Sequence, residues 1–161
     1  MTFPAKSASV IRAAMRADIE TIAAFNAAMA LETERKTLDP ETLRAGVSAV
    51  FDDPARGFYR VTQVDGVVVA CLLITFEWSD WRNGNWWWLQ SVYVRPDHRG
   101  QGVFGAMYRA VRVEAHEAKG VCGLRLFVEE ENLAAQRVYE RLGMAREAYR
   151  IFHERFRVES S

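Results

Sequence analysis

The stretch His98-Arg99-Gly100-Gln101-Gly102-Val103-Phe104-Gly105 decides the fold. It stands between a strand-like apolar run, Trp86–Val94, and a segment with helical periodicity, Gln101–Ala118. Its glycines let the backbone turn tightly and approach a ligand closely. The unpaired N–H groups at the start of the following helix favour an anion, and Arg99 adds a positive charge. The sequence therefore predicts a phosphate cradle between a strand and a helix.

Two other interpretations of these glycines stay open at this point. Gly100–Gly105 matches the GxGxxG dinucleotide fingerprint. The segment Arg95–Arg99 separates it from its strand, however, and too few residues follow Val94 for the βα units of a Rossmann domain. No Gly-Lys-Ser/Thr follows, so the stretch is not a P-loop. The second alternative is a purely structural turn from strand to helix.

Two motifs resemble those of the GNAT family, the Gcn5-related N-acetyltransferases. Arg99–Val103 is similar to the family's Arg/Gln-x-x-Gly-x-Gly/Ala cofactor motif, although Phe104 occupies its final small position. The segment Asn132–Met144 is similar to the family's Asn-x-x-Ala-x-x-x-Tyr-x-x-x-Gly-Phe element. The resemblance covers the whole chain in length and element order. It implies an α+β GNAT fold, a mixed and mostly antiparallel central sheet flanked by helices, in a single domain spanning residues 1–161.

The resemblance also implies acetyl-CoA as the co-substrate. In the family, the strand before the loop splays from its neighbour and bonds the pantetheine amides through its backbone. Asn132 is similar to the family's cofactor-contacting asparagine and also suits a helix cap. The residues carried over as cofactor-binding are Val92, Tyr93, Val94, Arg99, Gly100, Gln101, Gly102, Val103, Phe104, Gly105 and Asn132.

Two residues are candidates for catalysis. The family places a tyrosine where Tyr139 stands, and a phenol can give a proton to the departing CoA thiolate. Relatives that acetylate polyamines carry a carboxylate on the strand where this chain has Gln90. Glutamine cannot take a proton at neutral pH and can only orient a water molecule. Either water carries the amine proton to bulk solvent, or a carboxylate from elsewhere acts, with Glu32, Glu34 and Glu77 as options.

Acidic and aromatic residues are candidates for binding the acceptor. Glu32 and Glu34 fall where GNAT proteins line the acceptor groove, and a carboxylate pair there attracts a cationic amine. Trp81 stands at an expected hairpin tip, a natural place for contact with a substrate or partner. The expected strand Trp86–Val94 places Trp86, Trp88, Gln90 and Val92 on one face and Trp87, Leu89, Ser91 and Tyr93 on the other. Some tryptophans belong to the core or a dimer contact, and others suit a cation–π wall.

The overall composition excludes several classes of protein. Lys plus Arg and Asp plus Glu number 21 each among 161 residues, so the strongly basic surface of a nucleic-acid-binding protein is absent. No run approaches the length of a membrane span, and Met1–Val10 lacks the apolar run of a signal peptide. Cys71 and Cys122 lie in apolar strand-like runs, which predicts reduced thiols and a cytoplasmic protein. The three histidines have no metal-ligand spacing, so no metal is assigned.

The expected elements follow from turn and cap signals. Asp39-Pro40-Glu41 starts a helix, Asp65-Gly66 and Asn83-Gly84 mark hairpin turns, and Gly143 closes a helix. The segment Leu31–Leu38 reads as a loop. The remaining expected elements are strands at Val10–Ala14, Phe58–Val64, Val67–Trp78, Gly120–Val128 and Ala148–Val158, and helices from Asp18 to about Ala30 and over Asn132–Leu142.

Three functions remain open from the sequence. The first is acetyl transfer from acetyl-CoA to a primary amine of a small molecule, polyamine-like or amino-acid-like, by direct attack on the thioester. The second is the same reaction on a peptide or protein amine. The third is an acyl-CoA-binding module without catalysis, which the glutamine at the position of the base suggests. A homodimer is compatible with each of them.

Overall fold

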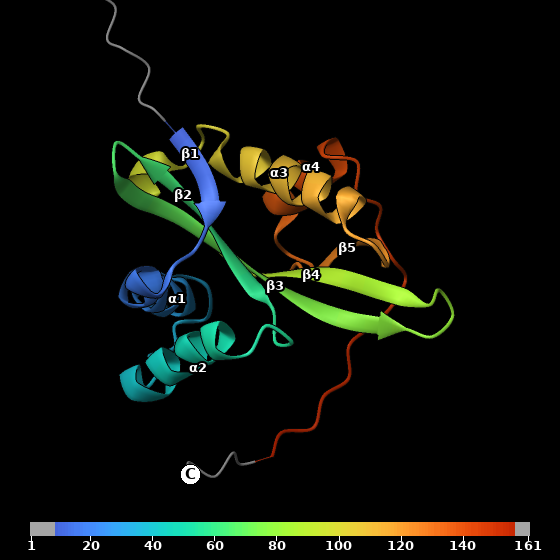
Figure 1. The fold of residues 1–161 in the computed structure, drawn as a ribbon, viewed down its shortest axis with the longest axis horizontal. Coiled ribbons are helices and arrows are strands. Elements are labelled where there is room, and N and C mark those ends of the chain that lie inside the picture. Colours follow the sequence, from blue (N-terminus) through green and yellow to red (C-terminus); the bar gives the residue numbers. More distant parts are fainter. Residues whose placement is uncertain (1–8, 157–161) are drawn as a thin grey trace, which may run out of the picture. The chain divides into compact units, whose positions relative to one another are not determined.

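The computed structural model describes residues 9–156 and divides the chain into two compact units, which meet in the sequence at Phe127 and Val128. In the described part of the first unit, three α-helices accompany a five-stranded sheet (Figure 1). Two 3-10 turns, η1 (Arg16–Asp18) and η2 (Pro96–His98), precede α1 and the glycine loop. The other elements are β1 (Ser9–Ala13), α1 (Ile19–Glu34), α2 (Pro40–Asp52), β2 (Phe58–Val64), β3 (Val67–Ser79), β4 (Gly84–Val94), α3 (Val103–Glu117) and β5 (Val121–Leu126).

The strands lie side by side in chain order, β1-β2-β3-β4-β5. The first four are antiparallel, whereas β5 runs parallel to β4 because α3 crosses over between them. Asp65 and Gly66 both have positive φ, 48° and 83°, as the tight β2–β3 turn requires. The predicted α+β fold, with a mixed and mostly antiparallel sheet, is confirmed, and β4, α3 and β5 form one parallel βαβ unit.

The helices of the first unit cover both faces of the sheet (Figure 1). Ile22 of α1 and Val47 of α2 belong to one buried cluster with Tyr59 of β2, and we call this side of the sheet the α1 face. The next residue, Arg60, points to the opposite face and forms an ion pair with Glu114 of α3 at 2.5 Å. The alternation of β2 thus places α1 and α2 on one side and α3 on the other.

Helix α1 is longer than the sequence predicted. The expected loop over Leu31–Leu38 is wrong in its first half, because α1 continues to Glu34. No glycine or proline interrupts the chain there, and leucine and glutamate are good helix formers. The helix ends at Arg35, whose φ of 52° is left-handed, and the Lys36 N–H then bonds the Ala30 carbonyl at 3.2 Å. Glu32 and Glu34 therefore stand on the last turn of a helix.

The second unit contains α4 (Leu133–Arg141). The Asn132 side chain caps this helix by accepting a hydrogen bond from the Ala135 N–H at 3.1 Å, and Gly143 follows it with φ of 92°. The predicted strand over Ala148–Val158 is wrong for residues 148–156, which form no ladder. An alternating apolar sequence favours a strand, but a strand forms only on a partner, and Phe152 is 93% exposed. Residues 157 and 158 lie outside the described residues.

Candidate acetyl-transfer site

The glycine loop has the geometry of an anion cradle. Gly100 and Gly102 adopt the left-handed conformation, with φ of 73° and 79°. Gly102 caps α3, and its carbonyl accepts the first helical bond, from the Ala106 N–H at 3.0 Å. The N–H groups of Val103–Gly105 therefore precede the helical ladder at the positive end of a helix of 15 residues. A Cβ on Gly100 or Gly102 would meet nothing within 4 Å, so open space lies beside the loop.

Arg99 connects this loop to β4 and to α1. Its Nε donates to the Val94 carbonyl at 2.8 Å, and its Nη2 donates to Glu32 Oε2 at 2.7 Å. The Tyr93 hydroxyl donates to the other oxygen, Glu32 Oε1, at 2.9 Å. These bonds hold the pKa of Glu32 below its ordinary value, chiefly through Arg99 and then through Tyr93. Burial, followed by the bond to Glu32, raises the pKa of Tyr93. Glu32 is therefore ionised and bound by two donors beside the cradle.

Strand β4 contains a bulge next to the loop. Its pairing with β3 steps from Leu73 opposite Gln90 to Cys71 opposite Tyr93, so the two strands advance by different numbers of residues. Ser91, within this bulge, has φ of 48°, which is uncommon for a residue with a side chain. The bulge re-aims the strand at the place where it leaves the hairpin for the glycine loop.

The bulge corrects one sequence prediction. Strict alternation placed Tyr93 on the face of Trp87, opposite Gln90. Because Cys71 and Leu73 share a face of β3, their partners Tyr93 and Gln90 share it too. Tyr93 accordingly packs on the α1 face, with its ring 5.1 Å from that of Phe25. The extra residue at the bulge shifts the alternation by one, which sequence alone did not show.

Strands β4 and β5 separate before the loop. Within the described residues their parallel ladder runs from Asn85 opposite Val121 to Leu89 opposite Leu126, and it goes no further. Among residues 9–156, the stretch 90–94 of β4 therefore has no partner strand on the β5 side. Such a stretch leaves backbone groups available for a ligand with amide groups of its own.

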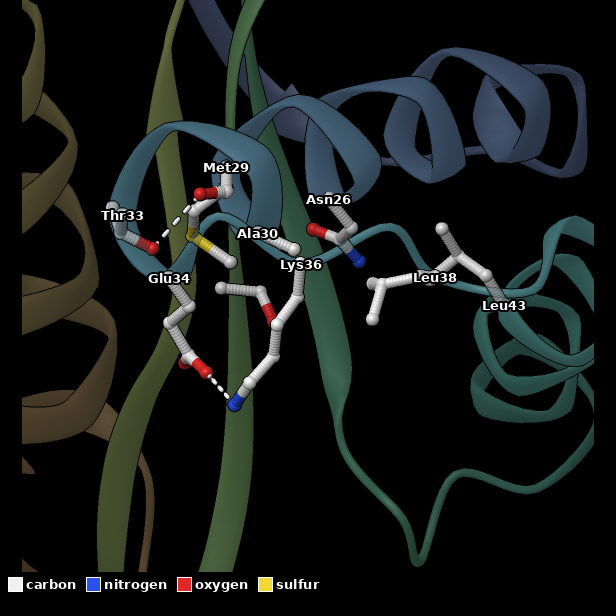
Figure 2. A pocket seen from close by; sticks show the side chains of 9 residues that line it. Asn26, Met29, Ala30, Thr33, Glu34, Lys36, Leu38 and Leu43 are labelled. Atoms are coloured by element: carbon white, nitrogen blue, oxygen red, sulfur yellow. Dashed lines mark hydrogen bonds and ion pairs between the residues drawn. The ribbon is translucent and has the colours of Figure 1, made fainter.

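A cavity of about 320 Å³ lies beside the bulge (Figure 2). Helix α1, the α1–α2 loop, the first turn of α2 and the bulge of β4 form its walls. Glu34 and Lys36 are ion-paired at its edge, and the Thr33 hydroxyl donates to the Met29 carbonyl at 2.8 Å. The lining residues are Asn26, Met29, Ala30, Thr33, Glu34, Lys36, Leu38, Leu43 and Ser91.

The model of the Acetyltransferase (GNAT) family matches residues 21–144, which is most of the chain. The chain belongs to the GNAT family. The match spans the cavity, the bulge and the glycine loop, and it confirms the family that the sequence predicted.

Several proteins are similar to this GNAT chain. Thialysine N-epsilon-acetyltransferase of Bos taurus is 37% identical over 76 residues, which are 47% of this chain and 44% of that protein. Mycothiol acetyltransferase of Corynebacterium aurimucosum is 29% identical over 131 residues, 80% of this chain and 43% of that protein. The chain thus matches less than half the length of either relative. The crystal structure of "a possible acetyltransferase from Clostridium difficile 630" has 40% identity and a TM-score of 0.86, over 92% of this chain and 97% of that one.

The other cofactor residues expected from the GNAT resemblance occupy the loop and the start of α3. The Gln101 side chain turns back and donates to the Asp97 carbonyl at 3.0 Å, so its amide nitrogen is engaged within the loop. Phe104 is half-buried, and its ring lies 6.3 Å from that of Tyr108 on the same helix. The departure from the family motif at Phe104 is thus accommodated by packing along α3.

The candidate acceptor residues of the GNAT chain lie in two places. Glu32 and Glu34 share the last turn of α1, but only Glu34 lines the cavity. Glu77, on the β3–β4 hairpin, accepts a hydrogen bond from Trp88 Nε1 and pairs with Arg125 at 3.0 Å. Trp81 is 88% exposed in the turn of that hairpin. The structure therefore does not gather all four into one site.

The three tryptophans of β4 divide by face. Trp87 is 8% exposed and contacts the rings of Phe58 and Phe76, so it belongs to the core. Trp86 and Trp88 are half-buried on the face of Gln90, with Arg125 4.0 Å from the Trp86 ring. Trp87 therefore belongs to the core, as predicted for some of the tryptophans, whereas the cation beside Trp86 is the chain's own Arg125.

Two candidate residues, Asn132 and Tyr139, belong to the second unit. Asn132 caps α4, as the sequence predicted. Tyr139 lies on the same helix, and burial raises the pKa of its phenol. Gln90, the other catalytic candidate, is exposed on β4, and its Nε2 donates to Thr75 Oγ1.

Two residues of the site were missed from the sequence. Ser91 was assigned only to a strand face, and no glycine or asparagine signalled its left-handed backbone. Asn26 received no role in the site, although it lines the cavity. Among residues 9–156, no three His, Cys, Asp or Glu side chains cluster as metal ligands. In the same residues, no helix has the length and apolar character needed to cross a membrane.

Proposed function

We propose that this GNAT protein transfers an acetyl group from acetyl-CoA to a primary amine of a small molecule. The amine nitrogen attacks the thioester carbon directly, so a C–N bond forms and the C–S bond breaks. The amine loses one proton and the CoA thiolate gains one. The observation that carries the proposal is the left-handed Gly100–Gly102 loop at the start of α3, directly after the open stretch of β4.

The loop and the strand hold the co-substrate in this proposal. The pyrophosphate takes the N–H groups of Val103–Gly105, and Arg99 adds its charge. The backbone of Val92–Val94 bonds the pantetheine amides, since this stretch has no partner in β5. The Val94 carbonyl already accepts from Arg99, which ties the two halves of the binding surface together. Asn132 is carried over as a cofactor-contacting residue from the GNAT resemblance alone.

The chain's own groups move the protons. Gln90 Oε1 orients a water molecule that carries the amine proton to bulk solvent, while Gln90 Nε2 is anchored on Thr75. A backbone N–H of the same strand stabilises the developing oxyanion. Tyr139, whose phenol stays protonated at neutral pH, donates to the leaving thiolate.

The acceptor enters the cavity beside Ser91. Its volume, about 320 Å³, is at the small end of ligand pockets, which favours a small amine over a peptide. Glu34 at its edge attracts a cationic amine. The similar thialysine and mycothiol acetyltransferases are named for small molecules, which supports a small-molecule acceptor here. Glu77 and Trp81 extend the acceptor surface along the hairpin. The single domain, the homodimer and the cytoplasmic location stay predictions.

Steady-state kinetics with acetyl-CoA and an amine series test this function. We expect rates that depend on both substrates with intersecting double-reciprocal lines, because attack is direct. Tyr139→Phe lowers kcat about 10²-fold, with unchanged CoA affinity by calorimetry. CoA binding without turnover in the unmodified protein contradicts the proposal and leaves the non-catalytic binding module.

A further inference from the structure

We propose that the Ser91 hydroxyl holds the nitrogen of the acceptor amine in place for attack on the thioester. Ser91 Oγ accepts a hydrogen bond from one N–H of the neutral amine, which leaves the nitrogen lone pair free to face the acetyl group. The inference rests on the proposed function, because it assigns a further catalytic residue to the same site.

The backbone of Ser91 is unusual for a residue with a side chain. Its φ of 48° is left-handed, a region that a Cβ disfavours. The Ser91 carbonyl accepts a hydrogen bond from the buried Cys71 Sγ at 3.8 Å, which helps to hold this conformation. Left-handed residues with side chains persist only where their surroundings hold them, and they are concentrated at functional sites. Glycine would adopt this backbone without strain but lacks a hydroxyl, so the serine points to a use for its side chain.

The left-handed residue places two neighbours on the same face of the sheet. Consecutive residues of a regular strand point to opposite faces. Gln90 lies on the α1 face, because its partner Leu73 packs against the buried cluster of that face. Ser91 lines the cavity, whose other walls are α1, the α1–α2 loop and α2, so it also lies on the α1 face. The bulge thus brings the Ser91 hydroxyl and the Gln90 amide to one side of β4, where the open stretch begins.

The Ser91 hydroxyl is available to a ligand. Ser91 is half-buried, and its side chain has no hydrogen-bond partner among residues 9–156. Other polar side chains of the wall are engaged, since the Thr33 hydroxyl donates to its own helix and Glu34 pairs with Lys36 (Figure 2). A hydroxyl oxygen accepts an N–H without taking a charge, which suits a neutral primary amine.

Ser91→Ala and Ser91→Gly separate the hydroxyl from the backbone. Both remove Oγ, but only glycine adopts the left-handed conformation without strain. With acetyl-CoA and propylamine, we expect both variants to lower kcat about 10–100-fold, because the nucleophile is no longer held, and to keep the CoA affinity measured by calorimetry. Activity of Ser91→Gly at or above that of the unmodified protein would overturn the inference, because the hydroxyl would then be dispensable. Weaker CoA binding in both variants would also overturn it.

Stability gives a second readout of the same variants. We expect Ser91→Gly to melt about 2–4 °C above Ser91→Ala, because only alanine is strained at this φ. Asn83→Gly is the matched control, since Asn83 has a φ of 50° but does not line the cavity, and its kcat should be unchanged. An equal fall of kcat in Asn83→Gly would contradict the assignment to Ser91. Ser91→Ala melting at or above Ser91→Gly would contradict the left-handed conformation on which the inference depends.

A binding measurement separates this inference from the proposed function. Propylamine is titrated into the CoA-saturated proteins and followed by NMR. We expect its affinity to be about 5–10-fold weaker in both Ser91 variants, the loss of one hydrogen bond. Equal affinity in the three proteins, or binding to none of them, contradicts the inference whether or not the protein acetylates amines. Weaker binding in the variants, with no acetylation by the unmodified protein, overturns the proposed function and retains the hydrogen bond to Ser91.

Discussion

Arg99 Nη2 lies 2.7 Å from Glu32 Oε2, so one ion pair joins the glycine loop to the last turn of α1. Both side chains are about half exposed, and Tyr93 adds its hydroxyl to the same carboxylate. Glu32 was expected to attract the amine. Its carboxylate is instead ion-paired with Arg99, the residue assigned to the proposed pyrophosphate. We therefore expect Glu32 to influence the affinity for acetyl-CoA.

Arg99→Ala tests the cradle. Loss of a charge-assisted contact weakens CoA binding about 10–100-fold in calorimetry. The matched ligand is pantetheine, which lacks the pyrophosphate and should bind both proteins equally. An equal loss for the two ligands would mean that Arg99 acts on the shape of β4 and not on the pyrophosphate.

Glu32→Gln tests whether Glu32 influences the binding of acetyl-CoA or the binding of the amine. The amide keeps a single acceptor oxygen for the two donors, Arg99 and Tyr93, and it removes a negative charge beside the cradle. We expect the KM for acetyl-CoA to fall by up to about fivefold, with the KM for the amine unchanged. A rise in the KM for the amine alone would contradict this and would indicate that Glu32 binds the acceptor.

Gly102→Ala and Gly105→Ala form a matched pair in the same loop. A Cβ at Gly102 has space but must adopt φ of 79°, so we expect a loss of about 1–2 kcal/mol in the free energy of unfolding. At Gly105, the Cβ would meet Arg109 Nη1 at 3.4 Å, an ordinary contact, and alanine gains up to about 1 kcal/mol in a helix. Thermal unfolding measures the change in melting temperature of each variant. Equal changes in the two variants would be incompatible with the left-handed conformation of Gly102.

Local chemistry explains which parts of this fold were predictable. Asp39, Asn132 and Gly143 signal helix ends through their own side chains or backbone freedom, and each was placed correctly. The same holds for Asp65-Gly66. These signals need no information about distant residues.

The sequence predictions were wrong or incomplete where residues far away in the sequence determine the local structure. The Ser91 bulge depends on how β3 and β4 pair, and no residue type announces it. The Glu32 carboxylate is engaged by Arg99, which lies sixty-seven positions away in the sequence. Residues 148–156 carry the alternation of a strand but form no ladder. The glycine loop was thus predictable from a contiguous motif, whereas the cavity beside Ser91 was not.

Gly123→Ala tests the aromatic wall. A Cβ on Gly123 of β5 would lie 2.3 Å from Trp86 Cζ3, so the ring must move. We expect a loss of about 1–3 kcal/mol in stability and a changed near-ultraviolet circular dichroism signal. Gly46→Ala is the control, because a Cβ there meets nothing within 4 Å. An unchanged spectrum in Gly123→Ala would contradict the packing of Trp86 over β5.

Asp18 predicts how stability depends on pH. Arg12 donates to both its oxygens, at 2.7 and 3.0 Å, and the Met15 N–H donates to Oδ2 at 2.7 Å. These bonds, chiefly that of Arg12, hold the pKa of Asp18 below its ordinary value of 3.8. The stabilisation is present above that value and is lost as pH falls through the folded pKa.

Urea unfolding of Asp18→Asn measures this contribution. We expect the variant to lose about 1.5–3 kcal/mol at pH 7 and to show a smaller decline in stability below about pH 4. Asp52→Asn breaks an exposed pair with Arg16 and should change stability by less than about 1 kcal/mol. Equal effects of the two substitutions would contradict the assignment of Asp18.

The most direct test of the account is a single reaction of the protein with acetyl-CoA and a panel of small primary amines, followed by mass spectrometry. The account predicts an N-acetylated amine and one CoA released for each product, with the yield reduced in Arg99→Ala at limiting acetyl-CoA. No acetylated amine from any member of the panel, in protein shown to bind CoA, would contradict it.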